Sequence, residues 1–325
     1  MSKPRIYITR KIPDKLVEPY KLQYDFRMWG KEDEAVPRDV LKKEVKQADG
    51  LLCVLTEQID EDLLQEAPYL KVAANMAVGY DNIDVNAAKK YGVIITNTPD
   101  VLTETTADLG FSLLLVTARR MIEANQYIKK DQWKNWSPYL LAGSDVHHKT
   151  IGITGMGRIG KAIARRAKGF GMSVMYYNRS RKPEAEDELQ AVYTDFDTLL
   201  AEADFVVSVL PLTAETKHIF NAEQFQKMKN SAIFINISRG GVVNEADLAE
   251  AVRTKQIKGA GLDVFEKEPV AADHPFMQLE EIVCMPHIGS ASEETRSGML
   301  NLCLENIHGV FTGRGPKTPV EAGRL

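Results

Sequence analysis

The stretch Ile151-Gly-Ile-Thr-Gly155-Met-Gly157-Arg-Ile-Gly160 decides the fold of this chain. It joins an apolar strand to three glycines in Gly-x-Gly-x-x-Gly spacing, and a helix-like run follows. Gly155 allows a sharp turn off the strand, Gly157 lets backbone approach a pyrophosphate, and Gly160 lets the helix pack close to the sheet. A second apolar run at 173–177 completes a βαβ unit. This context favours a dinucleotide site over a chance glycine-rich turn.

The second strand of this unit ends in Asn178-Arg-Ser-Arg-Lys182. An NAD site usually places Asp or Glu here to bind the 2′-hydroxyl of the adenine ribose. Asn178 stands near that place instead, and basic residues follow it. Guanidinium groups suit the oxygens of a 2′-phosphate, which a carboxylate would repel. The sequence therefore predicts that NADP(H) is preferred over NAD(H), and the alternative is a solvated basic turn.

The composition is typical of a globular protein of about two domains. The 325 residues are 44% hydrophobic and 26% charged. A formal net charge of −4 gives no electrostatic footprint for nucleic acid. The longest apolar run, at 109–118, is too short to span a bilayer, and the N-terminus enters a strand without a signal-peptide pattern. We expect a cytoplasmic protein that binds neither nucleic acid nor membrane.

The chain contains three isolated cysteines, Cys53, Cys284 and Cys303. They lie in apolar or helical contexts, which predicts reduced core residues. A catalytic thiol is the alternative, but nothing nearby resembles a nucleophile site. No cluster of Cys, His and Asp has metal-ligand spacing, so we expect no metal.

Short apolar runs alternate with helical patterns in the first hundred residues. Strands are predicted at 5–9, 50–55, 71–75 and 93–97, and helices at 36–47, 59–67 and 85–91. This alternation is typical of βαβ units with a parallel sheet. The block carries no phosphate-binding fingerprint, so we expect a second doubly wound domain of another role.

One long helix is predicted from Thr103 to Lys130, because a capping sequence precedes sustained apolar spacing. It is apolar on several faces, which predicts burial in the interior or at a subunit contact. A loop rich in aromatic residues and glycine follows at 133–148. A loop of this length in a compact protein is usually functional or part of an interface.

Three ionisable residues follow later apolar runs. These runs predict strands at 205–210, 232–237, 260–264 and 282–285. Arg239, Glu268 and His287 come after the last three of them. Because the carboxyl ends of strands line the ligand crevice of a doubly wound sheet, we expect these side chains to meet there.

The three residue types suit the reduction of a 2-oxo acid by a nicotinamide. An arginine holds the carboxylate and polarises the ketone. A histidine delivers a proton to the carbonyl oxygen, and a carboxylate orients the imidazole. We assign these roles to Arg239, His287 and Glu268. Taken singly, each has a structural alternative: a surface cation, a core histidine and a loop charge.

Other candidates for the acid–base pair are weaker. Three further histidines lie in helix or loop contexts with no companion set: His218, His274 and His308. Glu266 is a rival to Glu268 as the partner of His287. We prefer Glu268, because Pro269 fixes the chain directly after it.

Four motifs together carry a family resemblance. They are the glycine turn at 155–160, Asn236-Ile-Ser-Arg-Gly240, Gly261-Leu-Asp-Val-Phe-Glu-Lys-Glu-Pro269 and Pro286-His-Ile-Gly-Ser290. Through them the chain resembles the D-isomer-specific 2-hydroxyacid dehydrogenases along almost its whole length. Within that family it is most similar to NADPH-dependent glyoxylate/hydroxypyruvate reductases, including 2-ketogluconate reductases. That closer similarity rests on Asn178-Arg-Ser-Arg181, Val101-Leu-Thr-Glu-Thr-Thr-Ala-Asp108 and Asp145-Val-His-His-Lys-Thr150.

The resemblance implies further site residues. The N–H groups of Val78 and Gly79 would bind the substrate carboxylate, alongside Arg239 and His287. Asp263 would lie near the nicotinamide amide. The positions implied near the cofactor are Thr106, Gly155, Gly157, Arg158, Ile159, Gly160, Asn178, Arg179, Ser180, Arg181, Pro211, Thr216, Ile237, Asp263 and Gly289.

The resemblance also implies an α/β architecture of two doubly wound parallel-sheet domains. A Rossmann NADP-binding domain at 101–289 would be inserted in a flavodoxin-like substrate domain made of residues 1–100 and 290–325. The family is typically homodimeric through the nucleotide domain. The segment at 133–141 would then reach toward the partner subunit.

The leading hypothesis is NADPH-dependent reduction of small 2-oxo acids to D-2-hydroxy acids. Glyoxylate, hydroxypyruvate and 2-ketogluconate are the candidate substrates. One alternative is another D-2-hydroxyacid dehydrogenase, of the phosphoglycerate or phosphite type. A second alternative is a non-catalytic NAD(P)-sensing protein of the co-repressor kind. The absence of long disordered extensions from this sequence argues against that alternative.

Overall fold

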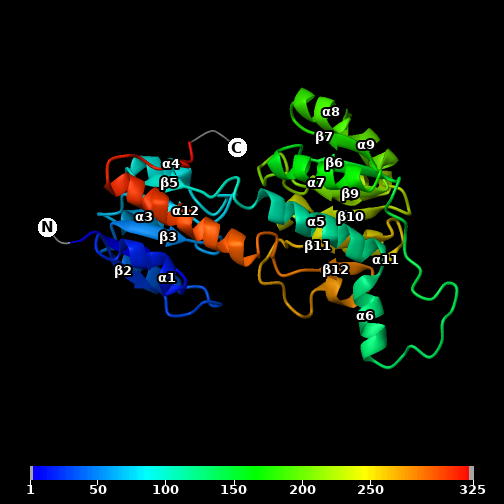
Figure 1. Cartoon of the computed structure of the whole chain (residues 1–325), viewed down its shortest axis with the longest axis horizontal. Coiled ribbons are helices and arrows are strands. Elements are labelled where there is room, and N and C mark those ends of the chain that lie inside the picture. The colour runs from blue at the N-terminus through cyan, green and yellow to red at the C-terminus, as the bar shows by residue number, and fades with distance from the viewer. Residues whose placement is uncertain (1–2, 322–325) are drawn as a thin grey trace. The chain divides into compact units, whose positions relative to one another are not determined.

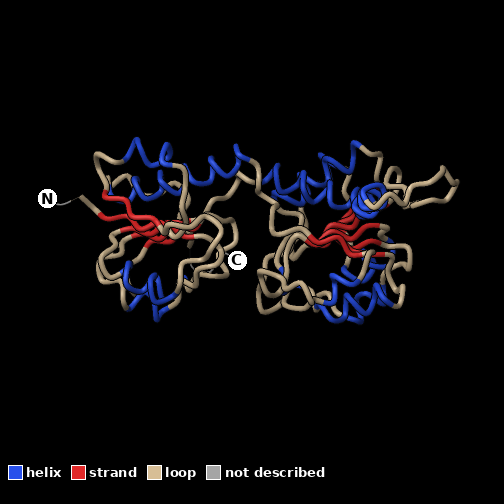
Figure 2. Tube along the Cα trace, turned by 90° about the horizontal axis from the view of Figure 1, so that it is seen from below, coloured by secondary structure: helices blue, strands red, loops and turns tan. Residues whose placement is uncertain are grey.

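The computed structural model describes residues 3–321, which form two compact units. Unit 1 combines the chain up to Leu102 with the chain from Ala291 onward, and unit 2 is Thr103–Ser290. In each unit a layer of strands lies between two layers of helices (Figure 2). The sheets have five and seven strands, and every strand pairing is parallel. The predicted fold class is confirmed.

Unit 1 has the strand order β2-β1-β3-β4-β5, the flavodoxin-like order, and Figure 1 labels β2, β3 and β5 of this sheet. Its strands are β1 Arg5–Ile8, β2 Asp25–Met28, β3 Gly50–Cys53, β4 Val72–Asn75 and β5 Ile94–Thr96. Its helices are α1 Asp14–Val17, η1 Glu18–Tyr20, α2 Arg38–Val45, α3 Glu61–Gln65, α4 Val85–Lys90 and α12 Glu293–Phe311. The carboxyl ends of β1, β3, β4 and β5 share one edge, because the strands are parallel.

The sequence analysis missed the edge strand β2. Its Asp25 and Arg27 are exposed, and Phe26 and Met28 are half-buried. An edge strand pairs on one side only and needs no continuous apolar run, so its signal is weak.

Unit 2 has the strand order β12-β11-β10-β9-β6-β7-β8, which places the first strand of the unit in mid-sheet. Its strands are β6 Thr150–Thr154, β7 Ser173–Tyr177, β8 Val192–Tyr193, β9 Phe205–Ser208, β10 Ile233–Asn236, β11 Gly259–Leu262 and β12 Ile282–Cys284. Its helices are α5 Thr103–Ala118, α6 Met121–Lys129, α7 Arg158–Gly169, α8 Pro183–Leu189, α9 Phe196–Glu202, α10 Ala222–Lys227, η2 Gly240–Val242, α11 Glu245–Arg253 and η3 Pro275–Gln278. From β6 the chain adds β7 and β8 on one side of the sheet and then β9 to β12 on the other side. The switch point between β6 and β9 is where Rossmann folds bind ligands.

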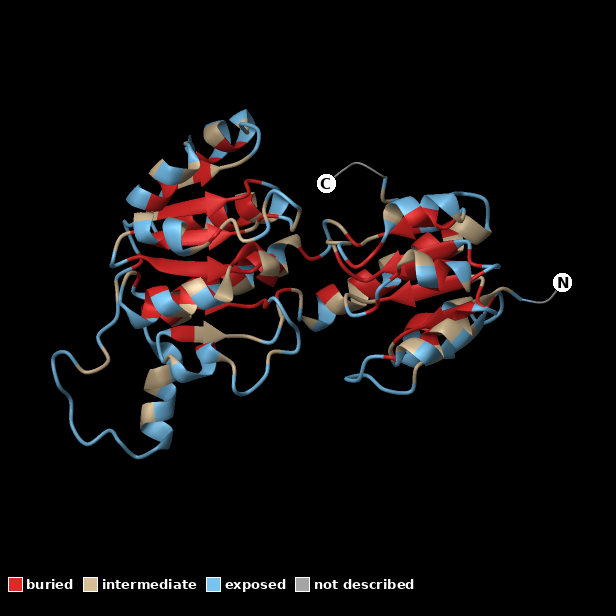
Figure 3. Ribbon diagram, turned by 180° about the vertical axis from the view of Figure 1, so that it is seen from behind, coloured by how far each residue is buried: buried red, intermediate tan, exposed pale blue. Residues whose placement is uncertain are grey.

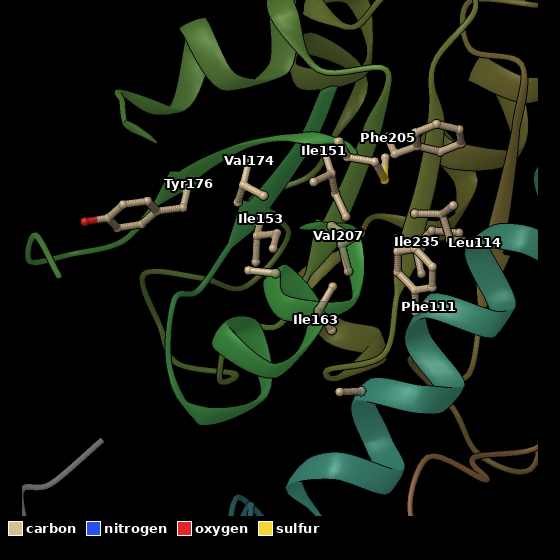
Figure 4. Packing of buried hydrophobic residues seen from close by; sticks show 14 of the residues in the cluster. Phe111, Leu114, Ile151, Ile153, Ile163, Val174, Tyr176, Phe205, Val207 and Ile235 are labelled. Carbon is tan, nitrogen blue, oxygen red and sulfur yellow. The ribbon is translucent and has the colours of Figure 1, made fainter. Parts of the chain in front are cut away.

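Helices α5 and α7 cover one face of this sheet. Phe111 and Leu114 of α5 and Ile163 of α7 point at strand residues such as Val207 and Ile235 (Figure 4). All five side chains are almost completely buried. Burial of such side chains stabilises a fold by about 1.5–3 kcal/mol each, so this layer fixes the strands whose ends form the site.

The predicted helix from Thr103 to Lys130 is wrong in one respect, because it is two helices. Arg120, between α5 and α6, adopts a left-handed backbone with φ 52°. Its guanidinium donates to both oxygens of Glu123, at 2.7 and 2.6 Å. Eight residues of α5 are buried but none of α6, so packing on the sheet ends where the break occurs.

The segment after α6 is a long exposed loop, as predicted (Figure 3). Its aromatic side chains Trp133, Trp136 and Tyr139 are 55%, 74% and 87% exposed.

Between residues 3 and 321, no helix has both the length and the hydropathy to span a bilayer. The cysteines Cys53 and Cys303 are buried and Cys284 is half-buried, all three as free thiols.

Candidate active site

His287 and Glu268 are in direct contact at the carboxyl ends of neighbouring strands. Glu268 follows β11 and His287 follows β12, and the distance from Nδ1 of His287 to Oε2 of Glu268 is 2.6 Å. The other carboxylate oxygen accepts the N–H of Phe265 at 3.0 Å. The pair is half-buried, which leaves the imidazole open on one side.

The electrostatics of this pair favour an ionised Glu268. Burial raises the pKa of its carboxyl, but the hydrogen bond and charge of His287 and the Phe265 N–H outweigh burial, and the net pKa is lowered. Because a carboxylate can only accept, Nδ1 of His287 carries a hydrogen. Nε2 is therefore the ring nitrogen left to exchange a proton with a substrate.

The turn that carries His287 is held by a buried carboxylate. His287 has a left-handed backbone with φ 53°. Oδ1 and Oδ2 of Asp263 accept the N–H groups of Ile288 and Gly289 at 2.8 and 2.7 Å. Asp263 is 1% exposed, and burial raises its pKa to about 6. These two hydrogen bonds fix the backbone directly after the histidine.

Arg239 follows β10 and lies beside the Glu268 loop. Its charge contributes to the lowered pKa of Glu268. A Cβ on the next residue, Gly240, would lie 1.8 Å from the carbonyl carbon of Phe265. Only glycine permits so close an approach, and this explains how the Arg239 turn and the Glu268 loop come together.

The rival Glu266 pairs with a different histidine. Its carboxylate contacts Nε2 of His218, and not His287. The expectation that His218, His274 and His308 have no companion is therefore wrong. His274 contacts Glu245 at 3.2 Å, and His308 contacts the hydroxyl of Tyr24 at 2.8 Å. Sequence separations of 29 to 284 residues concealed these pairs.

The glycine turn after β6 has the form of a pyrophosphate cradle. Gly155 has φ +101°, and a Cβ there would lie 2.8 Å from the Val209 carbonyl oxygen. A Cβ on Gly160 would lie 2.2 Å from the Gly155 oxygen, whereas nothing lies within 4 Å of one on Gly157. The helix α7 starts at Arg158 and Ile159 without a side-chain cap. An uncapped helix N-terminus directly after a glycine turn suits an anion, and a dinucleotide fits this turn.

The basic turn after β7 is internally bonded. Asn178 donates from Nδ2 to the Ser180 carbonyl at 2.7 Å. Arg181 donates from Nε and Nη2 to the carboxylate of Glu186, at 2.6–3.0 Å. Sequence reasoning gave no role to Glu186, because acidic residues are common on exposed helices.

Other predicted cofactor positions gather at the same edge of the sheet. A Cβ on Gly289 would contact Asp263 Oδ2 at 3.2 Å and Thr106 at 3.3 Å, so these three residues are neighbours. After β9, the hydroxyl of Thr216 donates to the Pro211 carbonyl at 2.6 Å. Ile237 directly follows β10 and is buried.

In unit 1 the loop after β4 is held by two asparagines that the sequence analysis missed. Asn75 donates from Nδ2 to the Gly79 carbonyl at 3.0 Å, and Asn97 donates to the Val78 carbonyl at 2.8 Å. The N–H of Thr98 donates to the Ala77 carbonyl at 2.8 Å. Three successive carbonyl groups, those of Ala77, Val78 and Gly79, accept hydrogen bonds in this way. The N–H groups of Val78 and Gly79, by contrast, make no hydrogen bond within residues 3–321.

Candidate metal ligands do not cluster. In the part of the chain that the structure describes, no three His, Cys, Asp or Glu side chains are grouped as a metal site requires.

Comparison with known proteins identifies the family. Residues 111–289 match the family model described as D-isomer specific 2-hydroxyacid dehydrogenase, NAD binding domain. The chain belongs to this family. It is therefore an oxidoreductase of the class that acts on 2-hydroxy acids, with the Rossmann nucleotide-binding domain in unit 2.

This dehydrogenase is similar to its relatives along nearly its whole length. It is 47% identical to the glyoxylate reductase of Pyrococcus horikoshii and 49% identical to that of Thermococcus onnurineus, over 98% of this chain and 96% of each relative. A crystal structure of a Thermus thermophilus protein has TM-score 0.92 and 40% identity, covering 98% of this chain and all of that one. A structure of an NADPH-dependent glyoxylate/hydroxypyruvate reductase from Sinorhizobium meliloti has TM-score 0.84 and 32% identity, covering 98% and 97%.

Proposed function

We propose that the protein is an NADPH-dependent reductase that converts small 2-oxo acids to D-2-hydroxy acids, with glyoxylate and hydroxypyruvate as the main substrates. The observation that carries the proposal is the 2.6 Å contact of His287 with Glu268 beside Arg239. The names of the relatives point to the same substrates. The larger 2-ketogluconate is a further candidate.

The chemistry follows from the three side chains. When bound, the dihydronicotinamide supplies the hydride that reduces C2 of the oxo acid. His287 gives the proton on Nε2 to the carbonyl oxygen, so the hydride forms the new C2–H bond and the proton forms the O–H bond of the 2-hydroxy acid. Glu268 stabilises the positive charge of the imidazole before the transfer. Arg239 offers a fixed cation to the substrate carboxylate and the polarised ketone.

We propose that the N–H groups of Val78 and Gly79 also bind a carboxylate of the substrate. The support lies within unit 1, where Asn75 and Asn97 hold the two carbonyl groups of this loop. Two adjacent N–H groups with no internal partner form an anion site of the kind seen at helix ends.

A substrate panel tests the function. Glyoxylate, hydroxypyruvate, 2-ketogluconate and pyruvate are each assayed with NADPH and with NADH. We expect the highest kcat/KM with glyoxylate or hydroxypyruvate and NADPH. Absence of turnover with all four acids would refute the reductase proposal and favour a sensing role. A higher kcat/KM with NADH would refute only the cofactor preference.

We also propose that the protein is a homodimer formed through unit 2. The exposed side chains of Met121, Ile122 and Ile128 on α6 continue into the exposed aromatic residues of the following loop. A hollow of about 870 Å³ lies beside α6 and is lined by apolar and charged residues together, among them Ile122, Lys130 and Glu281. Exposed apolar surface of this kind is typical of a subunit contact.

Light scattering on the purified protein measures the mass of the assembly directly. A monomer at micromolar protein concentration would refute the homodimer proposal. The cytoplasmic location stays a prediction.

A further inference from the structure

Glu186 on α8 is engaged with the basic turn predicted to bind the 2′-phosphate. Arg181 donates from Nε to Oε1 and Oε2 at 2.8 and 3.0 Å, and from Nη2 to Oε2 at 2.6 Å. This side-on pairing uses the geometry with which a guanidinium would bind two phosphate oxygens. The same donors cannot serve both anions at once.

Glu186 is the fixed member of this pair. The hydroxyl of Tyr176 donates to Oε1 of Glu186 at 2.7 Å, and the N–H of Lys182 donates to that hydroxyl at 2.7 Å. Tyr176 is fully buried, and its hydroxyl points away from the other labelled core residues (Figure 4). The side chain of Glu186 is only 18% exposed, whereas that of Arg181 is 67% exposed. The carboxylate therefore holds the guanidinium, and not the reverse.

Glu186 is ionised at neutral pH. The hydrogen bonds from Arg181 and then from Tyr176 lower its pKa. Burial raises the pKa of Tyr176 to about 12, so the hydroxyl stays a donor. A permanent negative charge thus lies against the arginine that we assign to the 2′-phosphate.

We infer that Glu186 is a specificity-determining residue, an internal anion that competes with the 2′-phosphate of the cofactor for Arg181. The inference rests on the proposed use of NADPH. Glu186 limits the preference for NADPH by holding Arg181 and by repelling the phosphate. Its removal strengthens phosphate binding and leaves the rest of the adenosine site unchanged.

The same helix supplies matched controls. Glu184 pairs with Lys161 at 2.7 Å and Glu188 pairs with Arg165 at 2.8 Å, both exposed contacts of α8 with α7. Glu184→Gln and Glu188→Gln remove the same charge from the same helix without touching Arg181. Glu186→Gln is the test variant, because the amide oxygen can still accept from Tyr176.

The experiment measures binding of 2′,5′-ADP and 5′-AMP to the full-length protein by calorimetry. We expect Glu186→Gln to bind 2′,5′-ADP about three- to tenfold more tightly than the wild type, as removal of a nearby like charge predicts. Affinity for 5′-AMP should not change. The gain should shrink at high salt, because exposed charges are screened. Both control variants should stay within about twofold of the wild type for either ligand.

A second variant is needed in case Glu186→Gln does not fold. Tyr176→Phe removes the anchor of Glu186 and should raise 2′,5′-ADP affinity in the same direction by a smaller factor. Unchanged or weaker 2′,5′-ADP binding in both variants would overturn the inference. Weaker 5′-AMP binding in Glu186→Gln would overturn it as well, since Glu186 would then be serving as the ribose carboxylate.

A different result would refute the proposed use of NADPH. The wild-type protein would then bind 2′,5′-ADP and 5′-AMP with equal affinity. The comparison of variant with wild type still decides the role of Glu186 in that case.

Discussion

Two glutamates on the loop after β11 each contact a histidine from another loop, and only one of these two pairs has the surroundings that we propose for a catalytic site. Glu266 and Glu268 are two residues apart, and they contact His218 and His287. Both histidines have a left-handed backbone, with φ 51° and 53°, and both pairs are partly exposed. In local geometry the pairs are alike.

Their neighbours differ. The turn of His287 is fixed by two hydrogen bonds to a buried aspartate, and Arg239 contributes to the lowered pKa of Glu268. The pair of His218 and Glu266 joins the loop after β9 to the loop after β11. The histidine–carboxylate contact alone does not distinguish the two pairs, whereas the adjacent cation and the fixed backbone do, and on these grounds we propose the His287 pair as the acid–base pair.

The largest effect is expected from His287→Ala. Loss of the proton donor should lower kcat/KM for glyoxylate by about 10²–10⁴-fold, the usual contribution of a general acid. The measurement is steady-state NADPH oxidation. His218→Ala is the matched control, and equal losses in the two variants would erase the distinction between the pairs.

Glu268→Gln should lower kcat/KM by about tenfold to a hundredfold, because the imidazole loses its charged partner. The pH profile is more specific. The pKa of Glu268 is lowered below its ordinary value of about 4.3, so the ionised pair exists above that value and is lost as pH falls through the lowered pKa. Wild-type activity should show this acid limb, and the variant should lack it. An acid limb retained by Glu268→Gln would assign it to another group.

Gly240→Ala tests the close approach of the Arg239 turn to the Glu268 loop. Its Cβ would overlap the Phe265 carbonyl, so the backbone must move, at a cost of about 1–3 kcal/mol. We expect a lower melting temperature and lower kcat. Gly241→Ala is the control, because the atoms nearest to its Cβ belong to the flexible Leu212 side chain, at 3.2 Å and beyond. Equal melting temperatures for the two variants would contradict the argument.

The smallest effect is expected from Glu266→Gln. His218 keeps a neutral partner, so kcat/KM should fall by less than about tenfold and the acid limb should remain. The pH–rate profile and a thermal melt check this. A loss as large as that of Glu268→Gln would make Glu266 part of the acid–base machinery.

Much of the fold was predictable because it rests on local signals. Apolar runs, capping residues and the Gly155–Gly160 turn predicted most of the observed strands. The errors fell where packing decides the outcome. The edge strand β2 has no continuous apolar run, and the break at Arg120 occurs where α5 leaves the sheet.

The candidate site was predictable in its residue types and only partly in its contacts. Arg239, Glu268 and His287 follow strands, and parallel topology brings strand ends to one edge. The roles of Asn75, Asn97 and Glu186 could not be read from spacing, because each depends on a partner that the fold brings near.

The sequence by itself determined that the chain has two parallel-sheet domains and a dinucleotide turn, since periodicity and glycine spacing are properties of contiguous residues. The preference for Glu268 as the partner of His287 could be stated from the sequence and is seen in the structure, whereas tertiary structure alone decided which anion holds Arg181. Glu266 and Glu268 are two positions apart, and in the sequence only the proline after Glu268 distinguishes them. Their contacts become different only when the packing of Gly240 on Phe265 and the hydrogen bonds of Asp263 fix where each side chain lies.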